Sequence, residues 1–113
     1  MVVARMTVWK YRSGQREEAL ETLDKIMAIG MRGFRGDVIL LSEEDPDSEV
    51  ILTFWDDEDA MEASAEQLYH PTGALKEPLE ELEKYLTGPP EVKEFRVYSA
   101  RAREVTPAIT RPA

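Results

Sequence analysis

The chain has 113 residues, which is enough for one domain with a modest core and too few for two. Its 14 basic and 23 acidic residues give a formal charge of -9, which argues against nucleic acid or an anionic membrane as the main partner, because Lys and Arg drive binding to phosphates. The chain contains no cysteine, which excludes disulfides and thiolate chemistry and suits a cytoplasmic location.

The first expected element is a strand over residues 2–9. No basic segment with a long apolar core precedes it, so we expect no signal peptide, and no apolar run approaches the roughly 20 residues of a membrane helix. Alternation places four apolar residues on one face: Val2, Ala4, Met6 and Val8. The other face carries Val3, Arg5, Thr7 and Trp9. A charge beside a large aromatic ring is typical of a strand that lines a cavity, although the solvent face of an edge strand shows the same mixture.

An amphipathic helix of about four turns is expected next. Ser13-Gly14 offers an N-cap, and Gly30 stands where a C-terminal glycine belongs. The apolar residues at helical spacing are Ala19, Leu20, Leu23, Ile26 and Met27.

Two apolar runs, residues 38–41 and 50–55, are joined by turn formers at residues 44–48, which predicts an antiparallel hairpin. Both runs are apolar at nearly every position, whereas a sheet covered on one face alternates apolar with polar residues. Both faces must therefore be covered. We expect helices of the same chain on one face and a second copy on the other, which makes a homodimer through the sheet face.

The four acidic residues 56–59 open a second expected helix. Consecutive helix positions point in different directions, so these carboxylates do not converge on one ion, and we expect a helix N-terminus and no metal site. The inward residues of this helix are expected to be Ala60, Met61, Ser64, Ala65 and Leu68.

Residues 70–73 break the helical pattern, which then resumes in a third helix. Its leucine stripe consists of Leu75, Leu79, Leu82 and Leu86. Pro78 either kinks this helix or occupies its first turn. A last strand is expected over residues 92–100, and residues 102–113 are expected to form a disordered or loosely packed tail.

The order strand, helix, strand, strand, broken helix, strand predicts an α+β domain over residues 1–101. Two crossovers of helix length produce the ferredoxin-like βαββαβ arrangement, a four-stranded antiparallel sheet with helices on one face. Pairing of two bare sheet faces would then form a dimeric α+β barrel.

Three segments resemble the antibiotic-biosynthesis monooxygenase family of dimeric α+β barrels. They are Gly33-Phe34-Arg35-Gly36 entering the second strand, Ile51-Leu52-Thr53-Phe54-Trp55 closing the third, and Asp57-Glu58-Asp59-Ala60-Met61 opening the next helix. The resemblance spans about residues 2–100. It implies a dimeric barrel and, among the family's activities, cofactor-independent oxygenation of phenolic or quinol substrates or haem degradation.

The haem-degrading branch uses an asparagine, a tryptophan and a histidine at positions that correspond here to Ala4, Ser64 and a place near Ala74. None of the three matches. His70 lies nearby but in the predicted break, so the resemblance favours oxygenation over haem degradation.

Cofactor-independent oxygenation requires a dry apolar pocket, a base, and a donor for the developing oxyanion. A pocket between sheet and helices is expected to use Trp55 as a wall and His70 as the base, because histidine is the side chain that titrates near neutral pH. The candidate donors to the substrate are Tyr69, Arg35 and Arg5.

Each candidate also has a structural interpretation. His70 lies beside a proline in a loop, where surface histidines are common, and Tyr69 is equally suited to packing against the leucine stripe. Trp55 ends a strand buried on both sides, which favours packing. Arg5 lies in an otherwise apolar strand and requires either a carboxylate partner or a ligand anion.

Two hypotheses follow from these residues. The first is a small cytoplasmic monooxygenase that acts on an aromatic, phenolic or quinol compound without metal or organic cofactor. The second is a non-catalytic dimeric barrel that binds a small apolar molecule or serves in a stress response. Oxygen uptake with hydroquinones distinguishes them.

Overall fold

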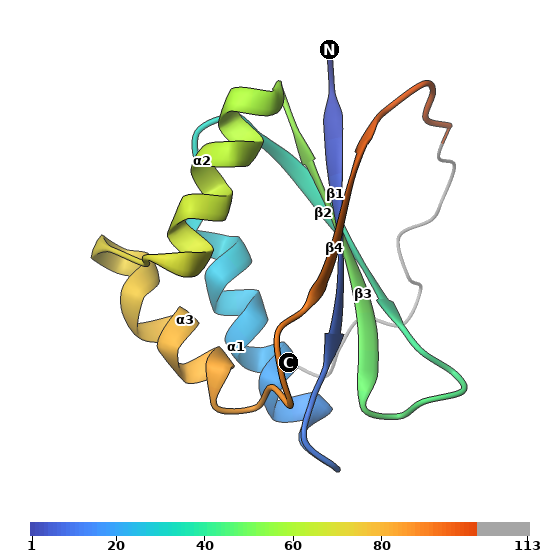
Figure 1. The fold of residues 1–113 in the computed structure, drawn as a ribbon, viewed down its shortest axis with the longest axis vertical. Coiled ribbons are helices and arrows are strands. Elements are labelled where there is room, and N and C mark those ends of the chain that lie inside the picture. The colour runs from blue at the N-terminus through green and yellow to red at the C-terminus, as the bar shows by residue number, and fades with distance from the viewer. Residues whose placement is uncertain (102–113) are drawn as a thin grey trace.

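The computed structural model describes residues 1–101, and the tail predicted for residues 102–113 lies outside the described residues. Four strands form one antiparallel sheet in the order β2-β3-β1-β4 (Figure 1). Their bounds are β1 Val3–Lys10, β2 Phe34–Leu41, β3 Ser48–Trp55 and β4 Glu91–Arg96. The predicted hairpin is present as β2 and β3, and the ferredoxin-like order of elements is confirmed.

The fourth strand is shorter than predicted. It ends at Arg96, which pairs with Val3 at the start of β1. One further backbone bond, from the Val97 amide to the Val2 carbonyl, continues the pairing. Beyond it β1 has no residue left to pair with, so the apolar pattern of residues 97–100 does not become sheet.

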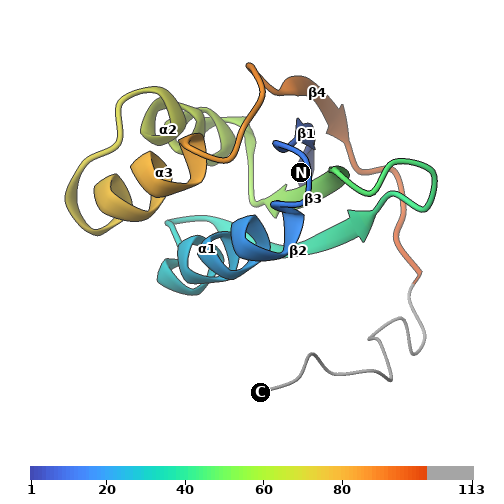
Figure 2. The ribbon, with the colours of Figure 1, turned by 90° about the horizontal axis from the view of Figure 1, so that it is seen from below.

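The helices all lie on one face of the sheet, as Figures 1 and 2 show. They are α1 Arg16–Ile29, α2 Glu58–Tyr69, the short 3-10 helix η1 Gly73–Leu75, and α3 Lys76–Glu83. Pro78 occupies the first turn of α3, where its missing N–H is not needed. No helix within residues 1–101 is long and apolar enough to cross a membrane.

The N-cap predicted for α1 is wrong. Gln15, not Ser13, occupies that position, and its side chain makes no capping bond. The chain turns at Gly14, with φ of 76°, before it reaches Gln15. The first residue of the helix, Arg16, instead donates to three carbonyl oxygens of the hairpin tip. These belong to Ser42, Asp45 and Ser48, at 3.1, 3.3 and 3.0 Å. Arg16 thereby ties the start of α1 to the β2–β3 turn.

The acidic run before α2 caps that helix, as predicted. Asp57 is the N-cap, and its carboxylate accepts a hydrogen bond of 2.9 Å from the Ala60 amide. This bond satisfies one of the amides that a helix start leaves without a partner.

The strand register fixes which side chains face the helices. Four rows cross the sheet on that side, and the two central ones contain Asp37, Thr53, Arg5 and Glu94, then Ile39, Ile51, Thr7 and Val92. The main core cluster contains Trp9, Tyr11, Ala19, Leu23, Ile51 and Leu82. A second cluster, Val3, Trp55 and Met61, lies under α2.

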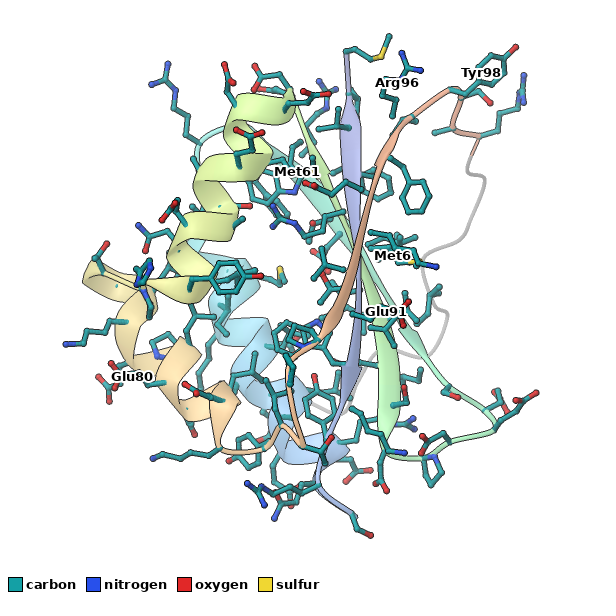
Figure 3. All side chains as sticks on the ribbon, in the orientation of Figure 1. Met6, Met61, Glu80, Glu91, Arg96 and Tyr98 are labelled. Carbon is teal, nitrogen blue, oxygen red and sulfur yellow. The ribbon has the colours of Figure 1, made fainter. Side chains whose placement is uncertain are left out.

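The opposite side of the sheet carries an apolar surface that no helix covers. We call this side the bare face. Its apolar residues are Ala4, Met6, Val8, Val38, Leu40, Val50, Leu52, Phe54 and Phe95, and at its β4 edge it also carries the ion-paired Glu91 and Lys93. Figure 3 shows Met6 on this side and Met61 on the helix side. Leu40 is 50% exposed and Phe95 is 49% exposed. The described chain therefore covers only one of the two apolar sides of the hairpin.

Candidate functional site

A cavity lies between the helix side of the sheet and the helices. Its volume is about 80 Å³, measured as the space open to the centre of a water molecule, well above the roughly 10–15 Å³ that one water requires. Strands β1 and β3 supply its floor: Arg5, Thr7, Trp9, Ile51, Thr53 and Trp55. Helices α1, α2 and α3 supply the walls, largely through leucine, isoleucine and methionine side chains. The β1 face that mixes charge with an aromatic ring therefore lines a cavity, one of the two interpretations open from the sequence.

A hydrogen bond and a ring contact hold Trp55 in the cavity wall. Its indole N–H donates to the Thr53 hydroxyl at 2.9 Å. Its ring centroid lies 5.2 Å from that of Phe34, at an interplanar angle of 60°, a tilted arrangement that aromatic pairs favour. Because strand alternation places Thr53 and Trp55 on the same side, both the hydroxyl and the ring face the cavity.

Arg5 places a buried cation in the same cavity. The residue is 5% exposed. Its guanidinium donates to the Ser64 hydroxyl at 2.8 Å and to the Met61 carbonyl, both from α2. Within residues 1–101 no carboxylate forms an ion pair with it. The carboxylate partner that the sequence left open is therefore not found among the described residues.

The charge of Arg5 is compensated only at a distance. Burial lowers the pKa of its guanidinium from the ordinary value, while the nearby Glu94 and Tyr69 act in the opposite direction. Glu94 is the residue opposite Arg5 on the neighbouring strand. An arginine remains protonated at neutral pH despite such a shift, so Arg5 supplies a positive charge to an otherwise apolar cavity.

The rest of the described lining has no group that titrates near neutral pH. Its polar side chains are Thr7, Thr53, Ser64, Gln67 and the two tryptophan indoles. No histidine, aspartate, glutamate, lysine or tyrosine belongs to this part of the lining. Among the described residues that line the cavity, Arg5 is thus the one with an ionisable side chain.

Three predicted site residues lie outside the cavity lining. His70 caps the end of α2 with its backbone N–H, which donates to the Glu66 carbonyl at 2.8 Å, and its side chain is exposed. Tyr69 is 72% exposed and borders a shallow acidic surface hollow near Glu94. Arg35 is exposed and pairs with Asp56 at 3.3 Å. The fold thus brings Arg5 and Trp55 together, and the placement of the other three lends their predicted roles no support.

The haem-degrading interpretation also lacks support from the site. Of the three positions compared above, Ser64 lines the cavity, Ala4 lies on the bare face and Ala74 is exposed. The described lining supplies no imidazole to ligate a haem iron. Among residues 1–101 no group of three or more His, Cys, Asp or Glu side chains is placed to hold a metal ion.

A buried Tyr11–Glu49 pair was missed by the sequence reasoning. Glu49 is 0% exposed, and the Tyr11 hydroxyl donates to its Oε1. Burial raises the pKa of Glu49, and burial together with this bond raises the pKa of Tyr11. The other carboxylate oxygen, Oε2, has no hydrogen-bond partner in the described part of the chain. The alternation Glu49, Ile51, Thr53, Trp55 is the signal that would have placed this glutamate inside.

Comparisons with known proteins agree with the fold. The family model of antibiotic biosynthesis monooxygenases matches residues 1–73. Among solved structures, a proposed antibiotic biosynthesis monooxygenase of Chloroflexus aurantiacus J-10-fl has 18% identity and a TM-score of 0.74, with 90% of this chain and 98% of that chain covered. A second such protein, from Bordetella bronchiseptica, has 14% identity and a TM-score of 0.73, with 87% and 98% covered.

SnoaB of Streptomyces nogalater, described as a cofactor-independent oxygenase, has 17% identity and a TM-score of 0.70, with 88% of this chain and 95% of that chain covered. A search of curated proteins finds no significant match. At these identities the solved structures show the fold, while the family model covers well over half of the chain. The chain therefore belongs to the antibiotic biosynthesis monooxygenase family.

Proposed function

We propose that this protein is a cofactor-independent monooxygenase whose substrate is a small aromatic, phenolic or quinol compound bound in the cavity, and that it works in the cytoplasm. One observation carries the proposal: a largely apolar cavity is lined by two tryptophan rings and by the buried Arg5, whose guanidinium forms no ion pair with a carboxylate of residues 1–101. The family's name and the description of SnoaB support the reaction class.

In the proposed reaction the protein binds the substrate, limits its contact with water and stabilises its negative charge. An electron-rich phenol or quinol, once it has lost a proton, passes an electron to molecular oxygen. The substrate supplies all four electrons that reduce the oxygen molecule: one oxygen atom replaces a ring hydrogen in the quinone product, and the other leaves as water with two hydrogens from the substrate. The largely apolar walls reduce the contact of a bound substrate with bulk water, which strengthens charge interactions inside the cavity. Arg5 stabilises the negative charge on the substrate oxygen, and Trp55 holds the ring in place.

Oxygen uptake with a panel of hydroquinones tests the proposal. Arg5→Met removes the charge and keeps an apolar side chain of similar length, so the fold should survive. We expect uptake to fall roughly 100-fold, as when one oxyanion donor is lost. His70→Ala is the matched control, because His70 is exposed and lies outside the cavity lining, and its uptake should equal that of the natural protein.

Two results would count against the proposal. If His70→Ala abolishes uptake and Arg5→Met does not, the chemistry lies outside the cavity. If hydroquinones bind but none is oxidised by the natural protein, the non-catalytic binding barrel is the better description.

The proposal includes a homodimer that pairs two bare faces. Apolar surface left in water costs about 25 cal/mol of free energy for every Å². Exposed apolar patches of this kind usually mark an interface. Adjacent residues on opposite sides of β2 offer a matched test: Leu40, on the bare face, is 50% exposed, and Leu41, on the helix side, is 48% exposed.

Sedimentation at micromolar concentration should therefore show a dimer for the natural protein and for Leu41→Glu. Leu40→Glu should sediment as a monomer, because the substitution would place a charge in the interface. A monomeric natural protein would remove the dimer from the proposal.

A further inference from the structure

We infer that the cavity accepts its substrate as the phenolate anion, already deprotonated, and that Arg5 makes this selection in place of a general base. The inference rests on the proposed function, because it specifies the form in which that substrate binds. Two observations carry it: the chemistry of the described lining and the hydrogen bonds of Arg5.

The described cavity wall contains no proton acceptor for a phenol. Its polar side chains, threonine, serine, glutamine and indole, do not take up protons near neutral pH. The buried Glu49 does not belong to the lining and already accepts the Tyr11 hydroxyl. A neutral phenol inside the cavity would therefore have no side chain to which it could pass its proton.

Arg5 has binding capacity to spare for an anion. A guanidinium carries five N–H donors, and the side-chain bonds found for Arg5 use acceptors on Ser64 and Met61, which are both neutral. A phenolate oxygen would form charge-assisted bonds, which are roughly twice as strong as neutral ones. The phenolate loses more hydration than a neutral phenol on entering the cavity, and its attraction to the buried guanidinium, which apolar surroundings screen little, offsets that loss.

The charged groups around Arg5 do not cancel this preference. Glu94 of β4 lies opposite Arg5 in the register but is exposed and forms no ion pair with it. Asp37 of β2 lies in the same row two strands away, and Tyr69 at the end of α2 is exposed. Inside the cavity, Thr53, Ser64 and the tryptophans are neutral. The cation thus meets the ligand with no anion between them.

The walls restrict the anion to one charge on a flat apolar body. Trp9 and Trp55 present aromatic surfaces, and Leu79 and Leu82 close the cavity from α3. A second charged group would be buried without a partner, which is costly. The substrate class is therefore a phenol, naphthol or enol that is acidic enough to ionise and is otherwise apolar.

A nitrophenol tests this inference without turnover, because its phenolate absorbs visible light and its neutral form does not. The chain's two tryptophans both line the cavity, so quenching of their fluorescence reports binding. With protein in excess, the pH titration of absorbance gives the pKa of the bound nitrophenol. We expect this pKa to lie at least about one unit below that of the free compound, which corresponds to tenfold tighter binding of the anion.

Arg5→Met should bind the nitrophenol without this shift, while Arg5→Lys should restore part of it by returning the charge. Arg35→Met is the control, since Arg35 is exposed and paired with Asp56, and it should show the full shift. Circular dichroism confirms that each variant is folded.

The outcomes separate this inference from the proposed function. Binding without a shift, or with the pKa of the nitrophenol raised, overturns the inference, while hydroquinone uptake still decides the function. An equal shift in Arg5→Met assigns the selection to another group and overturns the role of Arg5. Failure of the natural protein to bind any phenol also overturns the inference.

Discussion

Gly33 sits where the α1–β2 loop touches α2, and replacing it with alanine tests the packing at the edge of the cavity. Its φ is 81°, a left-handed conformation that favours glycine. An added Cβ would lie 2.5 Å from the Cβ of Ala60 and 3.8 Å from that of Asp56. The Gly33 carbonyl also accepts the Asp56 amide at 2.8 Å, which fixes the loop. Neither Cβ is the end of a flexible side chain, so the backbones themselves would have to move apart.

The expected loss has two parts. The left-handed conformation costs an alanine about 1–2 kcal/mol, and an overpacked contact costs about 1–3 kcal/mol. The free energy of unfolding should therefore fall by about 2–5 kcal/mol. At roughly 4 °C per kcal/mol for a domain of this size, the melting temperature should fall by roughly 8–20 °C.

Gly14→Ala is the matched control. Gly14 has a φ of 76°, close to that of Gly33, and no atom lies within 4 Å of an added Cβ. This variant should therefore lose only the conformational part. Urea unfolding of both variants at one protein concentration gives the difference, which is the steric part alone.

A double substitution sharpens the test. Ala60→Gly removes the Cβ that Gly33→Ala would strike, so the two changes together should cost less than the sum of the single changes. Equal losses for Gly33→Ala and Gly14→Ala, or strictly additive effects of Gly33→Ala and Ala60→Gly, would refute the close contact.

Two further predictions concern buried and capping carboxylates. Because burial raises the pKa of Glu49 above 4.5, its contribution to stability is full below that value and is lost as pH rises toward the folded-state pKa. Glu49→Gln should therefore gain stability relative to the natural protein as pH rises from about 4.5 to 7, and a difference that stays constant in thermal unfolding would contradict this. Asp57→Ala should cost about 0.5–2 kcal/mol because it removes the cap of α2. Asp59→Ala, in the same first turn, loses only the smaller interaction with the helix dipole, so equal urea midpoints for the two variants would argue against the cap.

The sequence predicted which side chains of the first strand share a face, because strand alternation is a geometric rule; it left open whether that face lines a cavity or meets solvent. Once residues 2–9 are assigned to a strand, Arg5 and Trp9 must share a face, and the structure places both in the cavity. The same rule applies to Thr53 and Trp55, which lie on one side of β3 and both line the cavity. Where the two-residue alternation of a strand decides the face on which a side chain lies, sequence reasoning located that side chain correctly.

Side chains at element ends could not be placed in this way. His70 and Tyr69 lie where α2 stops, and Arg35 lies at the register shift between Phe34 and Gly36. No repeating pattern fixes the direction of such residues. The burial of Glu49 was missed for another reason. In the sequence, a carboxylate next to a polar turn resembles the acids of the hairpin tip.

The proposed dimer depends on the bare face, and the apolar pattern that led to this proposal is also visible in the fold. The hairpin runs are apolar at almost every position, so both sides of β2 and β3 carry apolar side chains. The helices cover one side, and Leu40 and Phe95 remain about half exposed on the other. The apolar pattern led us to expect a second copy on that face, and sedimentation tests this expectation.

The central claim is that the cavity beneath α1 and α2 is where the substrate binds. The most direct measurement is a crystal structure of the protein with a bound nitrophenol. The account predicts the phenolate oxygen within hydrogen-bond distance of the Arg5 guanidinium and the ring against Trp55. A nitrophenol bound instead in the surface hollow beside Tyr69, with the cavity unchanged, would contradict it.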